Sequence, residues 1–262
     1  MESILIQANA KINLDLKIVG KKPDGYHLID GLFQSIDLAD FLLFEKSKKN
    51  QFSGAIICPD SQNIILKAQR ILEEKTDKKL PCEIHLQKSI PVSAGLGGGS
   101  ADAAATLVAF NRLYGLGLPK KELVKIGLKI GADVPFFLYG GTCGVKGIGE
   151  KITPLKIKLP KFLLLFRPHK RLETKMMYEL YDKTGKDFFS LAKGLCPDIN
   201  KIEEHFAKFK IKLKLSGSGP TVFGEIDNYE LIKKIIEGYQ GFNGDVFICR
   251  PQDRALNIIW KT

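Results

Sequence analysis

The chain has 262 residues, of which 44% are hydrophobic and 26% are charged, proportions typical of a globular protein with one large or two modest cores. Forty Lys and Arg against 29 Asp and Glu give a formal net charge of +11, which favours anionic partners such as nucleotides, phosphorylated metabolites or nucleic acid. The basic residues are scattered in short pairs without an arginine-rich arm, so the composition does not itself indicate nucleic-acid binding.

The cysteines and the apolar runs argue against several further classes. Five cysteines lie far apart with no Cys-x-x-Cys pair, and four dispersed histidines give no metal-ligand spacing. The longest apolar run, at 162–166, is too short to span a bilayer, and the N-terminus lacks the pattern of a secretion signal. We therefore expect a cytoplasmic protein with free thiols and no membrane partner.

The N-terminal part of the chain predicts strands followed by a helix. Residues 3–19 and 27–44 are mainly apolar and favour strands, and the segment 21–27 between them has the Pro and Asp-Gly signature of a turn. Residues 61–75 place their apolar side chains on one face, as an amphipathic helix does.

The segment 91–102 is the most informative stretch of the sequence. Four glycines, at positions 95, 97, 98 and 99, lie between an alternating strand at 83–88 and an alanine-rich helix. We expect this helix to open at Ser100, with Ser100 as its N-cap. In such an arrangement several backbone N–H groups converge on an anion at the positive end of a helix dipole, which indicates phosphate binding. The loop is neither a Walker A loop nor the dinucleotide fingerprint, and the structural alternative is a tight turn without a ligand.

A second helix is predicted from Pro119 to Gly131, and an isolated carboxylate follows it. Gly131 ends the helix, and Pro135 is expected to hold Val134 in an extended conformation. Asp133 then lies on a loop beyond a helix end, among apolar neighbours, where a carboxylate is unusual unless something binds it. The alternative is that Asp133 only fixes the loop or the helix end.

The second half of the chain predicts shorter, alternating elements. In order we expect a glycine-rich hairpin, a buried strand, a helical region, two strands around a Ser-Gly-Ser-Gly turn, a helix and a strand, at 140–150, 162–166, 173–209, 211–226, 228–239 and 245–249. Helices that alternate with antiparallel strands indicate an α+β fold. We expect two domains, at 1–154 and 155–262.

Four short motifs, in this order, resemble those of the GHMP kinases, a superfamily of small-molecule kinases. They are Ala-Lys-Ile-Asn, the glycine loop, Gly-Ala-Asp-Val-Pro and Ser-Gly-Ser-Gly, at 10–13, 91–102, 131–135 and 216–219. With Pro-Asp-Gly-Tyr-His at 23–27, the chain is most similar to the family that phosphorylates 4-diphosphocytidyl-2-C-methyl-D-erythritol in the non-mevalonate route to isoprenoid precursors. The resemblance covers nearly the whole chain.

This resemblance implies a fold and a reaction. The fold would be the two-domain α+β GHMP kinase fold, with a ribosomal-protein-like N-terminal domain and a ferredoxin-like C-terminal domain. The reaction would be transfer of the γ-phosphate of ATP to the 2-hydroxyl of the substrate, with ATP and Mg²⁺ as cofactors.

The resemblance also implies roles for individual residues. Asp133 would be the catalytic base, and Lys11 beside it would keep it ionised. ATP would bind to the loop formed by Pro91, Val92, Ser93, Ala94, Gly95, Leu96, Gly97, Gly98, Gly99, Ser100 and Ala101. No metal ligand is assigned, because ATP would carry the Mg²⁺, with Ser100 as the one candidate contact. The substrate would bind to Asn13, Tyr26, His27, Thr174, Tyr178, Gly217, Ser218 and Gly219, with aromatic faces stacked on the cytosine ring.

Other interpretations remain open at this point. Lys11 also fits an exposed strand lysine, and Tyr178 also fits a core aromatic. The function also fits another GHMP kinase, acting on mevalonate or homoserine, or a basic nucleic-acid-binding protein. The motif at 23–27 speaks against the former, because small aliphatic substrates need no stacking aromatic, and Lys11 with Asp133 speaks against the latter. We expect small-molecule partners and no nucleic acid, and we leave a homodimer open.

Overall fold

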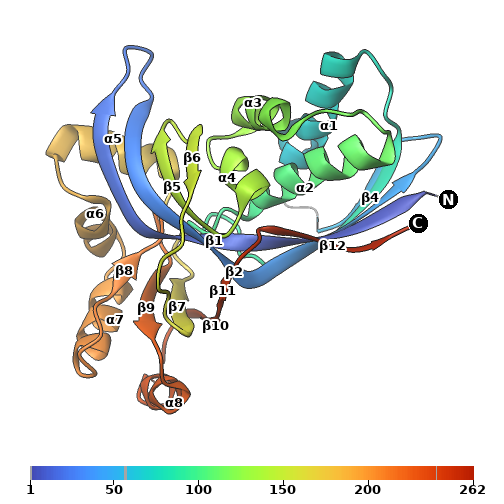
Figure 1. Ribbon diagram of the computed structural model, residues 1–262. Helices are drawn as coiled ribbons and strands as arrows, with labels where there is room; N and C mark the ends of the chain where they lie inside the picture. The colour runs from blue at the N-terminus through green and yellow to red at the C-terminus, as the bar shows by residue number, and fades with distance from the viewer. Residues whose placement is uncertain (1, 56–57, 240) are drawn as a thin grey trace.

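The computed structural model of the chain consists of two β-sheets that share an apolar interface, each covered by helices on its other face (Figure 1). It describes residues 2–55, 58–239 and 241–262. None of the helices within these ranges is long and apolar enough to cross a membrane.

The larger sheet is built around one long antiparallel hairpin. Its two strands, β1 (Ser3–Lys21) and β2 (His27–Lys46), pair over almost their whole length, from Ser3 with Glu45 to Lys21 with His27. The strand order is β12-β1-β2-β4-β3, and β5 and β11 also pair with β2. The added strands are β3 (Gln51–Gly54), β4 (Cys82–Gln87), β5 (Thr142–Gly147), β6 (Lys151–Pro154), β11 (Pro251–Gln252) and β12 (Leu256–Lys261).

Helices cover one face of this sheet (Figure 1). They are α1 (Ile64–Thr76), α2 (Gly98–Leu113), α3 (Lys120–Ile130) and α4 (Val134–Tyr139), with a short 3-10 turn, η1 (Asp60–Gln62), before α1. The central helix α2 contacts β1 and the other three helices, and its alanines are fully buried. Small side chains allow this close packing on several sides at once.

The smaller sheet has the strand order β10-β7-β9-β8, with every neighbouring pair antiparallel. Its strands are β7 (Phe162–Pro168), β8 (Lys214–Leu215), β9 (Val222–Ile226) and β10 (Gly244–Cys249). Helices α5 (Thr174–Thr184), α6 (Phe188–Leu195) and α7 (Asp198–Ala207) connect β7 to β8, and α8 (Tyr229–Glu237) connects β9 to β10. This is the ferredoxin-like arrangement that the resemblance to the GHMP kinases implies.

The two sheets meet through a shared apolar layer. Ala10 and Ile12 of β1 belong to the same buried cluster as Leu163 and Leu165 of β7 and Phe223 of β9. After β10 the chain returns to the larger sheet, where β12 pairs with β1, so the two ends of the chain lie close together (Figure 1). The division into domains at 154/155 stays a prediction. It marks the connection from β6 to β7, where the chain leaves the larger sheet, but not the connection from β10 to β11, where it returns.

Two local predictions are wrong. The central helix begins at Gly98, not at Ser100, and its N-cap is Gly97 in the left-handed region (φ 71°), because glycine tolerates that conformation and can also continue into the helix. Val134 is helical, not extended, because Pro135 lies in the first turn of α4, where a missing N–H breaks no helical hydrogen bond.

Candidate active site

A cavity of ≈ 560 Å³ lies where the two sheets meet. Its walls include Lys11 of β1, the glycine loop at 91–100 and Asp133 from the larger unit, and Thr174 and Ser218 from the smaller one. Polar side chains from separate elements thus converge on one concave space, which is the usual form of a small-molecule site.

Lys11 is almost completely buried and points toward polar partners in this cavity. Its Nζ donates a hydrogen bond to Asn13 Oδ1 (2.6 Å), lies 3.5 Å from Asp133 Oδ2 and 5.2 Å from the centre of the Phe33 ring. Asn13 is two residues further along β1 and therefore on the same face of the strand. The Lys11 side chain is only 4% exposed, so Lys11 is not a surface lysine. Asn13, Asp133 and the Phe33 ring stabilise its buried charge.

Asp133 does not serve as a helix cap. It occupies the N-cap position of α4, but its side chain makes no capping hydrogen bond. Its carboxylate, which is 34% exposed, instead faces the Lys11 ammonium and the cavity. A carboxylate held beside a cation and open to a ligand is suited to accept a proton from a bound hydroxyl.

The glycine loop presents the N-terminus of α2 to the cavity. The residues of the loop that line it are Pro91, Val92, Ser93, Ala94, Gly95, Gly97, Gly98, Gly99 and Ser100, whereas Leu96 and Ala101 are buried in the core. The N-cap residue of α2 is Gly97, and no side chain caps the first N–H groups of this helix. This is the arrangement that binds a phosphate group at a helix N-terminus.

The Ser-Gly-Ser-Gly loop of the smaller unit closes against the glycine loop. Ser216 Oγ donates a hydrogen bond to the carbonyl oxygen of Gly95 (2.9 Å). The Thr174 and Ser218 hydroxyls are hydrogen-bonded to each other (2.9 Å), and both residues line the cavity together with Gly217. The structure therefore brings these three predicted substrate residues to the site, whereas Gly219 lies outside the cavity wall.

Of the three predicted aromatic substrate residues, Tyr178 lines the cavity, whereas His27 and Tyr26 lie outside its wall. The ring of His27 stacks on that of Tyr178, with centroids 4.6 Å apart, and Tyr178 lines the cavity. Burial raises the pKa of Tyr178 to about 12, so its phenol is neutral. Tyr26, by contrast, is 60% exposed on the turn between β1 and β2 and does not reach the cavity.

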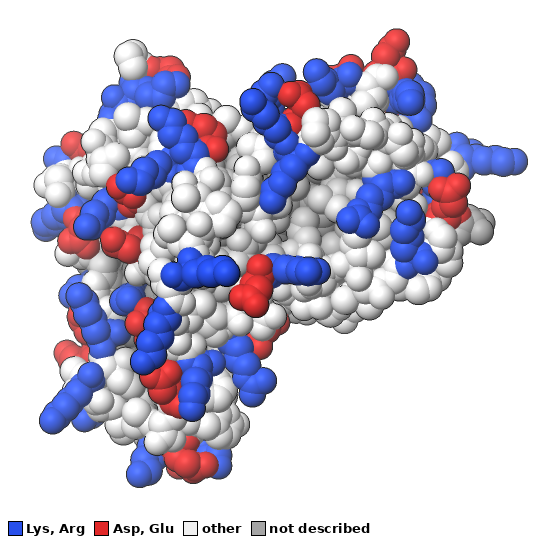
Figure 2. All heavy atoms as spheres, viewed as in Figure 1, with Lys and Arg blue, Asp and Glu red and all other residues white. Residues whose placement is uncertain are grey.

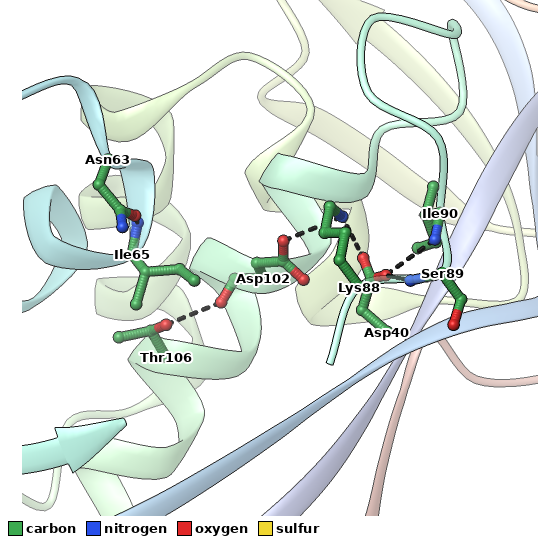
Figure 3. Close-up of polar contacts among 8 residues, drawn as sticks. All are labelled: Asp40, Asn63, Ile65, Lys88, Ser89, Ile90, Asp102 and Thr106. Carbon is green, nitrogen blue, oxygen red and sulfur yellow. Dashed lines mark hydrogen bonds and ion pairs between the residues drawn. The ribbon is translucent and has the colours of Figure 1, made fainter. Parts of the chain in front are cut away.

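Sequence reasoning missed two sets of charged residues near the site. Asp182 of α5 accepts a hydrogen bond from Lys21 (2.6 Å) and lies 2.7 Å from His27 Nε2. These two contacts lower the pKa of the Asp182 carboxyl. Lys88 lies between Asp40 and Asp102 behind the glycine loop (Figure 3). The available signals were the spacing of Asp182 four residues after Tyr178, and the position of Lys88 directly before the loop.

The surface charge shows no single basic patch on the face viewed in Figure 2. Lys and Arg side chains are spread over this face, and Asp and Glu side chains lie among them. The net positive charge is therefore not concentrated into one stripe there, as it is in many nucleic-acid-binding domains.

Comparisons with known proteins agree with this fold and site. Residues 63–141 match the family model described as GHMP kinases N terminal domain. A 4-diphosphocytidyl-2-C-methyl-D-erythritol kinase from Thermoanaerobacter pseudethanolicus is 38% identical, over 98% of this chain and 99% of the relative.

Solved structures show the same likeness. A crystal structure of 4-(cytidine 5'-diphospho)-2C-methyl-D-erythritol kinase is 27% identical with a TM-score of 0.79, covering 95% of this chain and 99% of that one. A homoserine kinase from Cytophaga hutchinsonii has a TM-score of 0.77 at 18% identity, over 99% and 98% of the two chains, and so shares the fold.

The fold, the glycine loop and the family model together define a GHMP small-molecule kinase. Within that superfamily, the full-length similarity is decisive: the chain belongs to the family of 4-diphosphocytidyl-2-C-methyl-D-erythritol kinases.

Proposed function

We propose that this protein transfers the γ-phosphoryl group of ATP to the 2-hydroxyl of 4-diphosphocytidyl-2-C-methyl-D-erythritol. The observation that carries the proposal is the pair formed by buried Lys11 and Asp133, 3.5 Å apart, in the same cavity as the uncapped N-terminus of α2. The Lys11–Asp133 pair can activate a hydroxyl, and the N-terminus of α2 can hold phosphates. These are the two requirements of a small-molecule kinase.

The proposed chemistry follows from the partners of each group. Asp133 accepts the proton of the 2-hydroxyl as this oxygen attacks the γ-phosphorus, and the bond from that phosphorus to the bridging oxygen of ADP breaks. Lys11, which lies 3.5 Å from Asp133 Oδ2, offsets negative charge on the reacting oxygens. Asn13 has a buried amide nitrogen without a hydrogen-bond partner among the described residues, so we assign it to an acceptor on the substrate.

The ATP phosphates are assigned to the loop at 91–101. Among the described residues no group of three or more His, Cys, Asp and Glu side chains could hold a metal ion. Mg²⁺ would be carried by the phosphates of ATP, and the Ser100 hydroxyl, which lines the cavity, would contact the phosphates or the ion. Bound in this way, Mg²⁺ would neutralise charge on the phosphates.

The cytosine group is assigned to the aromatic end of the cavity. Tyr178 offers a ring face there, and His27 offers a polar ring edge beside it. Tyr26 lies next to His27 and is exposed, so a change of its rotamer could bring a second ring to the base. Mevalonate and homoserine carry no base, and this end of the site would be unused by them.

The function is tested by ADP release with Mg-ATP and each of three acceptors: 4-diphosphocytidyl-2-C-methyl-D-erythritol, mevalonate and homoserine. We expect turnover with the cytidyl acceptor alone. Turnover with mevalonate or homoserine instead would reject the assignment of the aromatic end to cytosine. ADP release that is equal with and without any acceptor would reject the proposed acceptor altogether.

A further inference from the structure

A buried ammonium group bridges two buried carboxyl groups behind the glycine loop. Lys88 Nζ pairs with Asp40 and lies 3.1 Å from Asp102 Oδ2 (Figure 3). Asp40 is fully buried in β2, Asp102 is 2% exposed in α2, and Lys88 directly follows β4. Burial raises the pKa of the Asp102 carboxyl to about 8, so at neutral pH this group is largely protonated, and Lys88 and Asp40 form a pair without net charge.

This cluster holds both ends of the loop. Asp40 Oδ1 accepts hydrogen bonds from the backbone N–H groups of Ser89 (2.7 Å) and Ile90 (2.8 Å), immediately before the loop. Asp102 lies in the helix immediately after it. Lys88 therefore connects the segment before the loop, the segment after it and β2.

The ammonium group also lies at the point where α2 begins. A Cβ atom placed on Gly98, the first residue of α2, would be only 2.7 Å from Lys88 Nζ. Lys88 and Asp102 both contribute to the cavity wall, and Asp102 Oδ1 is buried without a hydrogen-bond partner among the described residues. The carboxyl groups thus lie beside the same helix N-terminus that is assigned to phosphate.

A carboxylate in this position opposes the binding of an anion. Charges within several ångströms of each other interact strongly in a partly desolvated site, and the Asp40 carboxylate without its cation would repel the phosphates of a nucleotide. Lys88 is the cation that the structure places between the carboxyl groups.

We propose that Lys88 is a positioning residue whose charge cancels that of the Asp40 carboxylate behind the loop and so allows the loop to bind the phosphates of ATP. This inference rests on the assignment of the ATP phosphates to the loop at 91–101. It distinguishes Lys88 from a residue that only maintains the loop, because a charge effect depends on how many phosphates the ligand carries.

The test compares adenosine, ADP and ATP by calorimetric titration of the wild type and of Lys88→Met. We expect the variant to lose affinity for ATP by on the order of tenfold or more, to lose less for ADP, and to bind adenosine within about twofold of the wild type. Equal losses for all three ligands would mean that Lys88 only maintains the loop, and unchanged ATP affinity would also overturn the proposal. A wild type that does not bind ATP would overturn the proposed function, and this inference with it.

A second variant keeps the test valid if Lys88→Met unfolds. The triple variant Lys88→Met, Asp40→Asn and Asp102→Asn removes the ammonium group and both ionisable carboxyl groups, and it preserves the shapes of the carboxyl side chains. We expect its ATP affinity to return to within about threefold of the wild type, because no uncompensated charge remains. ATP affinity as weak as that of Lys88→Met, or loss of ATP binding in a triple variant that unfolds like the wild type, would contradict charge compensation. Lys125→Met, in an exposed pair with Glu122, is the control for loss of a lysine.

Discussion

Ser216 Oγ donates a hydrogen bond to the carbonyl oxygen of Gly95 at 2.9 Å, and this contact joins the loop assigned to ATP to the loop of the smaller unit. The approach is so close that a Cβ on Gly95 would lie 2.2 Å from the carbonyl oxygen of Ser216. Gly95 also has a φ of 77°, which other residues rarely adopt. The two loops therefore form one continuous wall of the cavity.

Ser216→Ala removes this connection. We expect the free energy of unfolding to fall by about 1 kcal/mol, because the Gly95 carbonyl loses a partner at a partly buried position, and the KM for ATP to rise several-fold. Thermal unfolding and initial rates measure the two effects. Ser47→Ala, which removes an exposed hydroxyl bonded to Glu83, is the control, and equal effects of the two substitutions would contradict a role for the loop contact.

Gly149→Ala tests how Asp133 is positioned. The turn between β5 and β6 supports the segment before α4, since a Cβ on Gly149 would lie 2.2 Å from the carbonyl oxygen of Ala132. We expect a displaced Asp133 and a kcat lowered by at least about tenfold, with KM values changed much less.

The matched control for this prediction is Gly185→Ala. Gly185 also has a positive φ, of 67°, but nothing lies within 4 Å of an added Cβ. Both substitutions place an alanine at a positive φ, of 114° at Gly149 and 67° at Gly185, and the steric conflict is absent at Gly185. If both variants retain kcat, or lose it equally, the contact with Ala132 does not position Asp133.

Tyr178 tests the assignment of the cytosine group. Tyr178→Ala removes the ring face, so we expect the KM for the cytidyl substrate to rise by on the order of tenfold, while the KM for ATP stays within about twofold. Tyr178→Phe keeps the ring and should behave like the wild type. A Tyr178→Ala variant that loses stability but keeps its KM for the cytidyl substrate would show that Tyr178 is only a packing residue.

The raised pKa of the buried Asp102 carboxyl predicts that the stability of the protein depends on pH. Burial raises the pKa of its carboxyl from 3.8 to about 8, although Lys88 lowers it in part. The folded protein therefore binds this proton more tightly than the unfolded chain, so the contribution of Asp102 to stability falls as pH rises from about 4 to about 8. The variant Asp102→Asn has no ionisable group at this position and therefore lacks this loss. From about pH 5 to pH 8, the unfolding free energy of Asp102→Asn relative to that of the wild type should rise by more than about 1 kcal/mol.

The control for this pH dependence is Asp24→Asn. Asp24 is exposed and its pKa is lowered by Lys22, so the sign of its effect is opposite. Denaturant unfolding at several pH values measures all three proteins. A constant difference between the wild type and Asp102→Asn across this range would contradict a raised pKa.

Much of the site could be predicted because it lies in local patterns. The glycine loop between strand and helix, Lys11 with Asn13 on one strand face, and Asp133 after a helix end all depend on short-range geometry. The pairing of β12 with β1 could not be predicted, since nothing local specifies which distant strand an edge will join. Lys88, Asp40 and Asp102 are equally non-local, because Asp40 lies 48 residues before Lys88.

The errors at α2 and α4 have a common origin. Ser100 and Pro135 were assigned by their local preferences, an N-cap for the one and an extended preceding residue for the other. Other local preferences prevailed: Gly97 adopts the left-handed conformation as the N-cap of α2, and Pro135 is tolerated in the first turn of α4.

The most direct test of the central claim is single-turnover phosphoryl transfer by Asp133→Asn. Wild type and variant are mixed with Mg-ATP and the cytidyl acceptor, and binding of both ligands is measured separately. We predict transfer slowed by at least about a hundredfold, with both affinities within a few-fold of the wild type, because only the proton acceptor is lost. Transfer at the wild-type rate would contradict the assignment of Asp133 as the base, and with it the proposed role of the pair it forms with Lys11.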